Sequence, residues 1–379
     1  MARDGSTRFR GDPCKGFPSN THTQFYFSCP GTHRHFYVGY SLRSSRSTYQ
    51  ALKDPKVNET EDTQSIEGLK PAVSLFEERW NIFKLNRLAY FSFIFLIFLF
   101  VLALIGKALT RWIVVFDPQL VRLPEKFLPP LTPFTSEIVS AEYAPKFNIY
   151  LLGTDELGRD IFARMLEGTS ISLTVGFVAV SISIFLGIFF GGIAGFYGRL
   201  KFGFITIDTM IMRFVDIMLC FPTFFLILTV VALLPPSIYN IMIVIGLTSW
   251  MGTARFVRAE FLALRELDYV AAARSQAIPE WRIIFIHMVP NAIAPVLVSA
   301  TIGVATAILT ESSLSFLGFG VQPPDATWGN ILADGKQFIF DAPWITFIPG
   351  FSILFVVLAF NLCGEGLREA FNPRLKEGI

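Results

Sequence analysis

The stretch FLALRELDYVAAARSQAIPEWRIIFIHMVPN, from Phe261 to Asn291, determines how the rest of the chain is interpreted. It has mixed charges and favours helix, yet it lies between strongly apolar stretches, so we expect it at a membrane surface rather than inside the bilayer. The run Ala271–Ala273 favours helix, whereas Pro279 fits a first helical turn and pushes Ile278 toward an extended conformation. The pattern predicts two short helices with a bend between them, and Pro290 predicts a second break. A segment of this length between two membrane spans suggests a partner on that face.

The composition places the chain among integral membrane proteins. Of its 379 residues, 52% are hydrophobic and only 16% are charged; 40 are phenylalanine, and the mean hydropathy is +0.51. A soluble domain with so few charges could not cover that much apolar surface. The four cysteines lie far apart without paired spacing, which argues against a disulfide framework or a zinc site.

Apolar stretches of about twenty residues, the length that crosses a bilayer, recur along the chain. They predict six spans, at residues 88–109, 172–197, 206–234, 238–252, 292–310 and 344–362. Basic residues before the first span and after the last place both termini in the cytoplasm. The bent segment then also falls on the cytoplasmic side. The predicted fold class is therefore an all-α integral membrane protein with about six transmembrane helices, N-in and C-in, in the cell (inner or plasma) membrane.

The domain boundaries follow changes in composition. Residues 1–70 form a polar tail that we expect to be disordered, and a mistaken start codon is an alternative explanation of it. Cys29, His33 and His35 in this tail could bind a metal, although the disordered interpretation is preferred and no metal site is predicted. Residues 71–168 hold an interfacial helix, the first span and an extracytoplasmic loop. Residues 169–367 form the transmembrane core, and 368–379 form a cytoplasmic tail.

Two spans carry features that need a physical explanation. In the second, Ser183, Gly187, Gly191 and Gly195 form a stripe of small residues that lets another helix approach closely. In the third, Arg213 and Asp216 are three apart and can pair on one helix face, and Pro222 should kink the helix. Ionisable residues at membrane depth are candidates for a pathway, with structural pairing as the alternative. Those candidates are Asp208, Arg213, Asp216 and, at the end of the fifth span, Glu311.

Motifs of soluble enzymes are missing from the sequence. There is no G-x-x-x-x-G-K-[ST] loop for binding ATP phosphates, no H-E-x-x-H helix, no G-x-S-x-G elbow and no dinucleotide fingerprint. An enzyme is therefore not expected, no cofactor should bind directly, and no nucleic-acid partner is indicated. Energy for any active transport would have to come from another subunit.

The bent segment resembles the cytoplasmic coupling segment of ABC-importer permeases, whose pattern is EAA, three residues, Gly, nine residues and I-x-L-P. Here Ala272, Ala273 and Pro290 match it. Four positions depart from it: Ala271 replaces Glu, Ala277 replaces Gly, His287 replaces Ile and Val289 replaces Leu. Since the Gly normally supplies the bend, Pro279 could do so here. The alternative is an ordinary amphipathic interfacial helix.

Other stretches resemble the oligopeptide and dipeptide branch of that family more specifically. They are LGTDELGRDIFARMLEGTSISL at 152–173, VDIMLCFP at 215–222 and ESSLSFLGFGVQPPDATWGNIL at 311–332. The first contains Gly153, Thr154, Asp155, Gly158, Arg159 and Asp160, and it also looks like a helix start with Asp155 and Glu156 near the positive end. The third is expected to be a rigid loop or a broken helix, with Glu311 as the best candidate for lining a pathway.

The resemblance implies a type I ABC importer permease for di- or oligopeptides. It implies a second homologous permease, two ATP-hydrolysing subunits, and an extracytoplasmic substrate-binding protein, all working in the lipid bilayer. The coupling residues it implies are Asp268, Ala271, Ala272, Ala273, Arg274, Ala277, Pro279, Trp281, Arg282, His287 and Pro290. Nickel, glutathione or another small solute is the alternative cargo. A stand-alone secondary transporter or channel, and a membrane-anchored assembly factor, are alternatives from other classes.

Overall fold

The computed structural model describes residues 75–112, 117–134 and 148–371, which belong to one compact unit. In these ranges the chain is almost entirely helical, with two short antiparallel strand pairs: β1 (Thr132–Pro133) with β2 (Ile149–Tyr150), and β3 (Lys201–Phe202) with β4 (Ile205–Thr206). The helices are α3 (Leu75–Leu85), α4 (Arg87–Trp112), η2 (Leu123–Glu125), α5 (Ile161–Phe196), α6 (Ile207–Leu219), α7 (Thr223–Leu233), α8 (Ile238–Arg265), α9 (Asp268–Ser275), α10 (Glu280–Arg282), η4 (Ile283–Met288), α11 (Val289–Phe316), α12 (Trp328–Gly335), η5 (Lys336–Phe338) and α13 (Trp344–Ala370).

Within the described residues, five helices are long and apolar enough to cross a membrane, and the bent pair α6 and α7 makes a sixth if it counts as one span. Each of the six predicted spans overlaps one of these elements. Several helices extend beyond the apolar run that the sequence revealed. At 36 residues α5 is roughly 54 Å long, against about 30 Å of hydrocarbon, so polar turns outside the bilayer continue the same helix.

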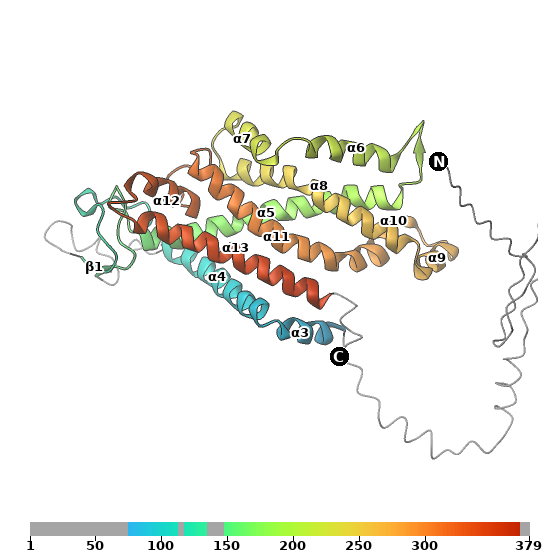
Figure 1. Ribbon diagram of the computed structural model, residues 1–379, viewed down its shortest axis with the longest axis horizontal. Coiled ribbons are helices and arrows are strands. Elements are labelled where there is room, and N and C mark those ends of the chain that lie inside the picture. The colour runs from blue at the N-terminus through green and yellow to red at the C-terminus, as the bar shows by residue number, and fades with distance from the viewer. Residues whose placement is uncertain (1–74, 113–116, 135–147, 372–379) are drawn as a thin grey trace, which may run out of the picture. The chain divides into compact units, whose positions relative to one another are not determined.

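The long helices α5, α8, α11 and α13 run side by side, as Figure 1 shows, with α9 and α10 at one end of them and α12 at the other. The main apolar cluster lies between these helices and includes the buried side chains of Val175, Ile245, Ile308 and Val356. A second cluster lies beneath α9, around Phe261, Val270 and Ile283. The bent segment is thus fixed to the helical core by its own small apolar centre.

Helices α5 and α8 pack closely along much of their length, and glycine makes this possible. A Cβ added at Gly187 would lie 2.5 Å from Thr253 Cγ2, and one added at Gly191 would lie 2.4 Å from the Ala254 carbonyl oxygen. A Cβ at Gly195 would lie 2.5 Å from Phe261 Cβ. These distances are too short for any side chain, which confirms that the predicted stripe is a helix-packing surface and identifies α8 as its partner.

We expect Gly191→Ala to destabilise the protein by about 1–3 kcal/mol, because the new methyl group would force α5 and α8 apart against a backbone oxygen. The matched control is Gly252→Ala, on α8, where nothing lies within 4 Å of an added Cβ. Thermal unfolding of the purified chain in detergent measures both. Equal midpoints for the two variants would show that the stripe does not set the helix distance.

The third predicted span is broken rather than kinked. Helices α6 and α7 meet at an angle of 81° across Cys220–Pro222. Pro222 stands at the N-cap of α7, where its missing N–H leaves no helical hydrogen bond unmade. The position of the break was predictable from this proline, whereas the angle between α6 and α7 depends on the packing of α7 against α8.

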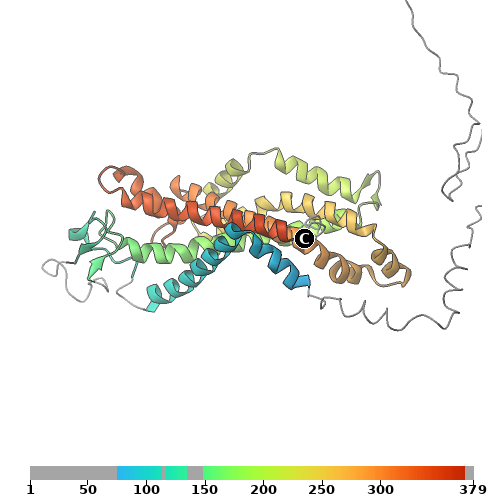
Figure 2. The ribbon, with the colours of Figure 1, turned by 60° about the horizontal axis from the view of Figure 1, so that its bottom comes forward.

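Helix α3, the first in the described residues, packs against the last span, α13. The chain turns sharply between α3 and α4, and Figure 2 shows the two helices diverging from this turn. Trp80 and Phe83 stack with ring centroids 5.6 Å apart, and Phe83 is buried with Ala89 and Cys363. A Cβ at Gly366 would lie 2.3 Å from Ala89 Cβ, so α13 approaches α4 closely here.

Candidate functional site

The bent segment has one buried face and one exposed face. On α9, Val270 and Ala273 are buried against the cluster around Phe261, whereas Ala271, Ala272 and Arg274 are exposed. Further along the segment, Asp268, Pro279, Trp281, Arg282 and Pro290 are exposed and His287 is half-buried. Most of the predicted coupling residues therefore form an outward surface, and the buried ones attach it to the core.

Several specific contacts hold this surface in place. The Arg274 guanidinium lies 5.0 Å from the centre of the Phe196 ring at the end of α5, and that of Arg282 lies 5.7 Å from the Trp281 ring. Such cation–π contacts restrain both arginines. Burial raises the pKa of the Tyr197 hydroxyl, and its hydrogen bond to Glu280 raises it further. The bond ties α10 to the C-terminal end of α5.

The bend is made at Ala277, and not by Pro279 as the sequence suggested. Ala277 adopts φ +54°, in the left-handed region where a side chain is strained. Its amide donates to the Arg274 carbonyl oxygen at 3.0 Å, and the Ile278 amide donates to the Ala273 carbonyl oxygen at 3.2 Å. This is the C-terminal capping geometry in which glycine is usual. Pro279 follows as the N-cap of α10.

We expect Ala277→Gly to stabilise the segment by about 1 kcal/mol, because glycine adopts a left-handed conformation without the Cβ clash. The matched control is Ala271→Gly, within helix α9, which should cost about 0.5–1 kcal/mol. Hydrogen exchange of the amides of residues 268–278 measures the local effect. Faster exchange in Ala277→Gly than in the unsubstituted chain would contradict the strain.

Pro290 does not break the chain as predicted. The backbone forms a π-helical turn at η4, and α11 begins at Val289, with Pro290 in its first turn. The wider π turn needs no N–H from the proline, so the helix continues from Glu280 to Phe316. This direct connection links the outward surface rigidly to a membrane span.

Two ion pairs join α6 to α8. The Arg258 Nη2 atom lies 2.6 Å from Asp208 Oδ2, and Arg255 pairs with Asp216. The predicted pair of Arg213 with Asp216 does not form: Arg213 is exposed, and Asp216 points to α8 instead. Local spacing favoured the intrahelical pair, but α8 supplies an arginine that satisfies the same carboxylate across the helix interface.

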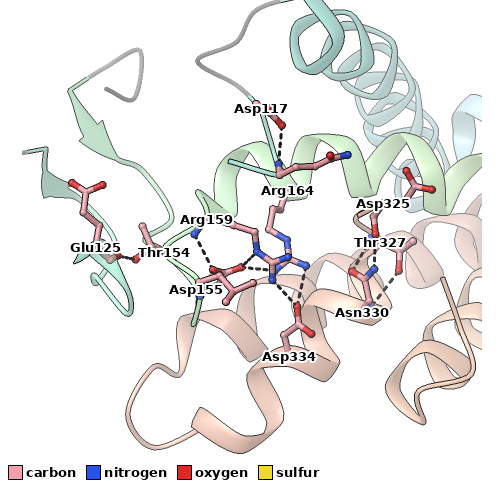
Figure 3. A network of polar contacts seen from close by, with 12 residues as sticks. Asp117, Glu125, Thr154, Asp155, Arg159, Arg164, Asp325, Thr327, Asn330 and Asp334 are labelled. Atoms are coloured by element: carbon pink, nitrogen blue, oxygen red, sulfur yellow. Dashed lines mark hydrogen bonds and ion pairs between the residues drawn. The ribbon is translucent and has the colours of Figure 1, made fainter. Parts of the chain in front are cut away.

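At the opposite end of the helices, a buried ion network joins the loop before α5 to α12 (Figure 3). Asp155 is fully buried; its Oδ2 atom lies 2.7 Å from Arg159 Nε and 2.6 Å from Arg164 Nη1. Both arginines also contact Asp334, at 3.3 and 3.0 Å. The backbone amides of Leu157 and Arg159 donate to Asp155 Oδ1, each at 2.9 Å.

The remaining motif residues shape the same loop. Gly153 and Gly158 have φ of +81° and +70°, and a Cβ at Gly158 would lie 1.8 Å from the Arg122 carbonyl oxygen. The Thr154 hydroxyl accepts a hydrogen bond from the Leu128 amide at 2.8 Å. The predicted helix start lies at the end of this motif: the N-cap of α5 is Asp160, whose carboxylate accepts from the Phe162 amide at 2.9 Å, and Asp155 and Glu156 lie just before it. Burial raises the pKa of Asp160 to about 6 despite that bond.

Glu311 is completely buried within α11. The Ser315 hydroxyl donates to its Oε1 atom at 2.7 Å. The helix continues to Phe316, so the loop of the third motif begins only after it and ends at α12. There, Thr327 and Asn330 form a capping box, and Asn330 also donates to the Asp325 carbonyl oxygen at 2.8 Å. In this chain Glu311 contacts neighbouring serines rather than an open cavity.

Sequence reasoning missed Arg164, Asp334 and the Thr327–Asn330 capping box. Arg164 lies among apolar residues near the start of a span, a position where a charge is costly unless it is paired, and this was the available signal. Asp334 carried no such signal, because its partners are at least 170 positions away in sequence.

No group of three or more His, Cys, Asp or Glu residues able to hold a metal occurs in the described part of the chain. The candidate metal ligands Cys29, His33 and His35 lie outside the described residues.

The chain matches two protein-family models. One, described as binding-protein-dependent transport system inner membrane component, covers residues 183–377, and the other, the N-terminal TM domain of oligopeptide transport permease C, covers residues 74–130. Among curated proteins, the dipeptide transport system permease protein DppC of Haemophilus influenzae is 39% identical over 79% of this chain and 95% of that protein. The oligopeptide transport system permease protein OppC of Bacillus subtilis is 32% identical over 86% of this chain and 97% of that protein. Among solved structures, a chain of the MetNI methionine ABC transporter in an inward-facing conformation is similar, with a TM-score of 0.42 and 17% sequence identity. The match covers 54% of this chain and 95% of the MetNI chain.

The fold and the family match define an integral inner-membrane permease, a transport component rather than an enzyme. The chain belongs to the family of binding-protein-dependent transport system inner membrane components, and within it to the branch of the DppC and OppC permeases. The predicted family, its branch, the helical membrane fold class and the inner-membrane location are thereby confirmed.

Proposed function

We propose that this chain forms half of the translocation path for dipeptides and short oligopeptides, with a second, homologous permease as the other half. The names of its relatives support the cargo class, since DppC and OppC proteins are named for dipeptide and oligopeptide transport. The observation that carries the proposal is the outward surface of α9 and α10, held to the core by a buried cluster and continuous with a membrane span.

The bent segment is a docking surface for the ATP-hydrolysing subunits, of which the complex has two. These subunits bind the ATP, and this chain supplies the surface that receives their movement. Its exposed small residues Ala271 and Ala272 allow close approach, and Arg274, Trp281 and Arg282 supply polar and aromatic contacts. Movement of the ATPases would shift α9 as a lever and, through η4, tilt α11 between inward- and outward-open states. In this proposal the segment and both termini lie in the cytoplasm, as the distribution of basic residues in the sequence predicts.

At the opposite end, an external substrate-binding protein delivers the peptide. A groove of about 220 Å³ between α5, α8 and α11 is the candidate path at membrane depth. Its walls combine apolar residues with Ser183, Ser249, Thr253, Ser299 and Thr306. Hydroxyls can hydrogen-bond a passing peptide without holding it tightly, which suits transport. Outside this lining lie Glu311, which is bonded to serines of its own helix, and the pairs of Asp208 and Asp216, which join α6 to α8.

The decisive experiment co-purifies the chain, with its second permease, and the two ATPases. We expect Arg274→Glu to reduce ATPase recovery at least tenfold and to abolish ATP-dependent uptake of Ala-Ala into vesicles. The matched control is Arg368→Glu, at an exposed position outside the segment, which should leave both unchanged. Full ATPase recovery with Arg274→Glu would reject the docking role. Uptake that persists without any ATPase would identify a stand-alone transporter instead.

A further inference from the structure

A second cavity lies at the end of the bundle opposite to α9. It measures about 660 Å³, within the range of small-molecule sites, and lies between α4, α5, the start of α8 and the loops at residues 117–119 and 325. One wall is apolar, with Val178 and Met242, and another carries the hydroxyls of Ser170 and Thr174.

Charged groups of both signs line this cavity. Lys107 comes from α4, Glu167 from α5, and Asp117 and Asp325 from the two loops. The carboxylates of Asp117 and Asp325 alone outweigh the Lys107 ammonium group, so the cavity is net negative. Figure 3 shows Asp325 beside Thr327, at the N-terminal end of α12.

The fold does not use these charges to pair with one another. Neither Lys107, exposed near the end of α4, nor Glu167, half-buried near the start of α5, forms a salt bridge within the described residues. Glu167 accepts one hydrogen bond, from the Ala326 amide at 3.2 Å, and its other oxygen has no protein donor among those residues. Opposite charges that face one cavity without pairing are suited to a ligand that carries both signs.

We infer that this cavity is an entry site for a zwitterionic peptide, in which Glu167 and Asp325 bind the α-ammonium group and Lys107 binds the α-carboxylate. The inference rests on the proposed import of peptides. A dipeptide carries both termini at neutral pH, and its side chains would lie against Val178 and Met242. A divalent cation is a poorer fit, because the described residues contain no metal-ligating cluster.

The test uses the complete transporter in liposomes with its binding protein loaded with radiolabelled Ala-Ala. Uptake is measured against the concentration of loaded binding protein for Glu167→Gln, Asp325→Asn and Lys107→Gln. Glutamine keeps an oxygen that can accept from Ala326, and Asp325 is exposed, so these variants should still fold. Glu365→Gln, an exposed carboxylate on α13, is the matched control.

We expect each carboxylate variant to lower the maximal uptake rate at least about tenfold, the order of one lost charged hydrogen bond. The concentration of binding protein giving half-maximal uptake should not change. A higher half-maximal concentration with an unchanged maximal rate would overturn the inference, because the cavity would then bind a basic side chain of the docked protein. Unchanged kinetics in all three variants would also overturn it. Failure of the unsubstituted transporter to take up Ala-Ala would instead reject the proposed function.

Discussion

Arg164→Met should lower the free energy of unfolding by about 2–3 kcal/mol, because a buried carboxylate loses one of its two charged hydrogen-bond partners. Arg164 is 2% exposed and contacts both Asp155 and Asp334. Asp155 is fully buried, and with Arg164 gone it would keep Arg159 as its single charged partner. Methionine fills a similar space but supplies no positive charge. Thermal or denaturant unfolding in detergent gives the difference.

The matched control is Arg368→Met, which removes an exposed arginine 3.7 Å from Glu365 one helical turn away. An exposed pair of this kind contributes at most about 1 kcal/mol, so the control should unfold close to the unsubstituted chain. If the two substitutions shift the unfolding midpoint equally, the network at the start of α5 does not stabilise the fold.

Val270→Asp should reduce peptide uptake at least tenfold by detaching α9 from the core. Val270 is fully buried in the cluster with Phe261 and Ile283, where an aspartate would find no basic partner among the cluster's apolar members. Burying an unpaired carboxylate costs several kcal/mol, more than a helix of eight residues can offset. A lever that is not fixed to α8 and α11 cannot transmit ATPase movement.

Three measurements separate this effect from general unfolding. The midpoint of thermal unfolding should fall little, since the main cluster between α5, α8, α11 and α13 is unchanged. Amides of residues 268–278 should exchange faster, and ATP hydrolysis should continue without uptake. Val270→Ile, which keeps an apolar side chain in the same cluster, is the control and should retain uptake. Tight coupling in Val270→Asp would contradict the lever mechanism.

The bent segment, residues 261–291, shows where sequence reasoning succeeds and where it stops. Its helical character, its bend and its place between two spans followed from alanine propensity, Pro279 and the apolar flanks. Assigning the bend to Ala277 did not follow, because alanine rarely adopts positive φ and only the surrounding contacts impose it. The continuity of the helix through Pro290 did not follow from the sequence either, because it depends on the π turn of η4.

The sequence by itself determined the membrane class, the approximate positions of the spans and the glycine packing stripe. These properties depend on local composition and on periods of a few residues, which a single chain displays directly. The family followed from the resemblance of the quoted motifs to those of known permeases. Only the tertiary structure decided the partners of Asp155, Asp208 and Asp216, the 81° break between α6 and α7, and the cavity lined by Lys107 and Glu167. The pairs of Asp208 with Arg258 and of Asp216 with Arg255, and the walls of the cavity, join residues far apart in sequence, and such contacts follow from three-dimensional packing, which local spacing does not encode.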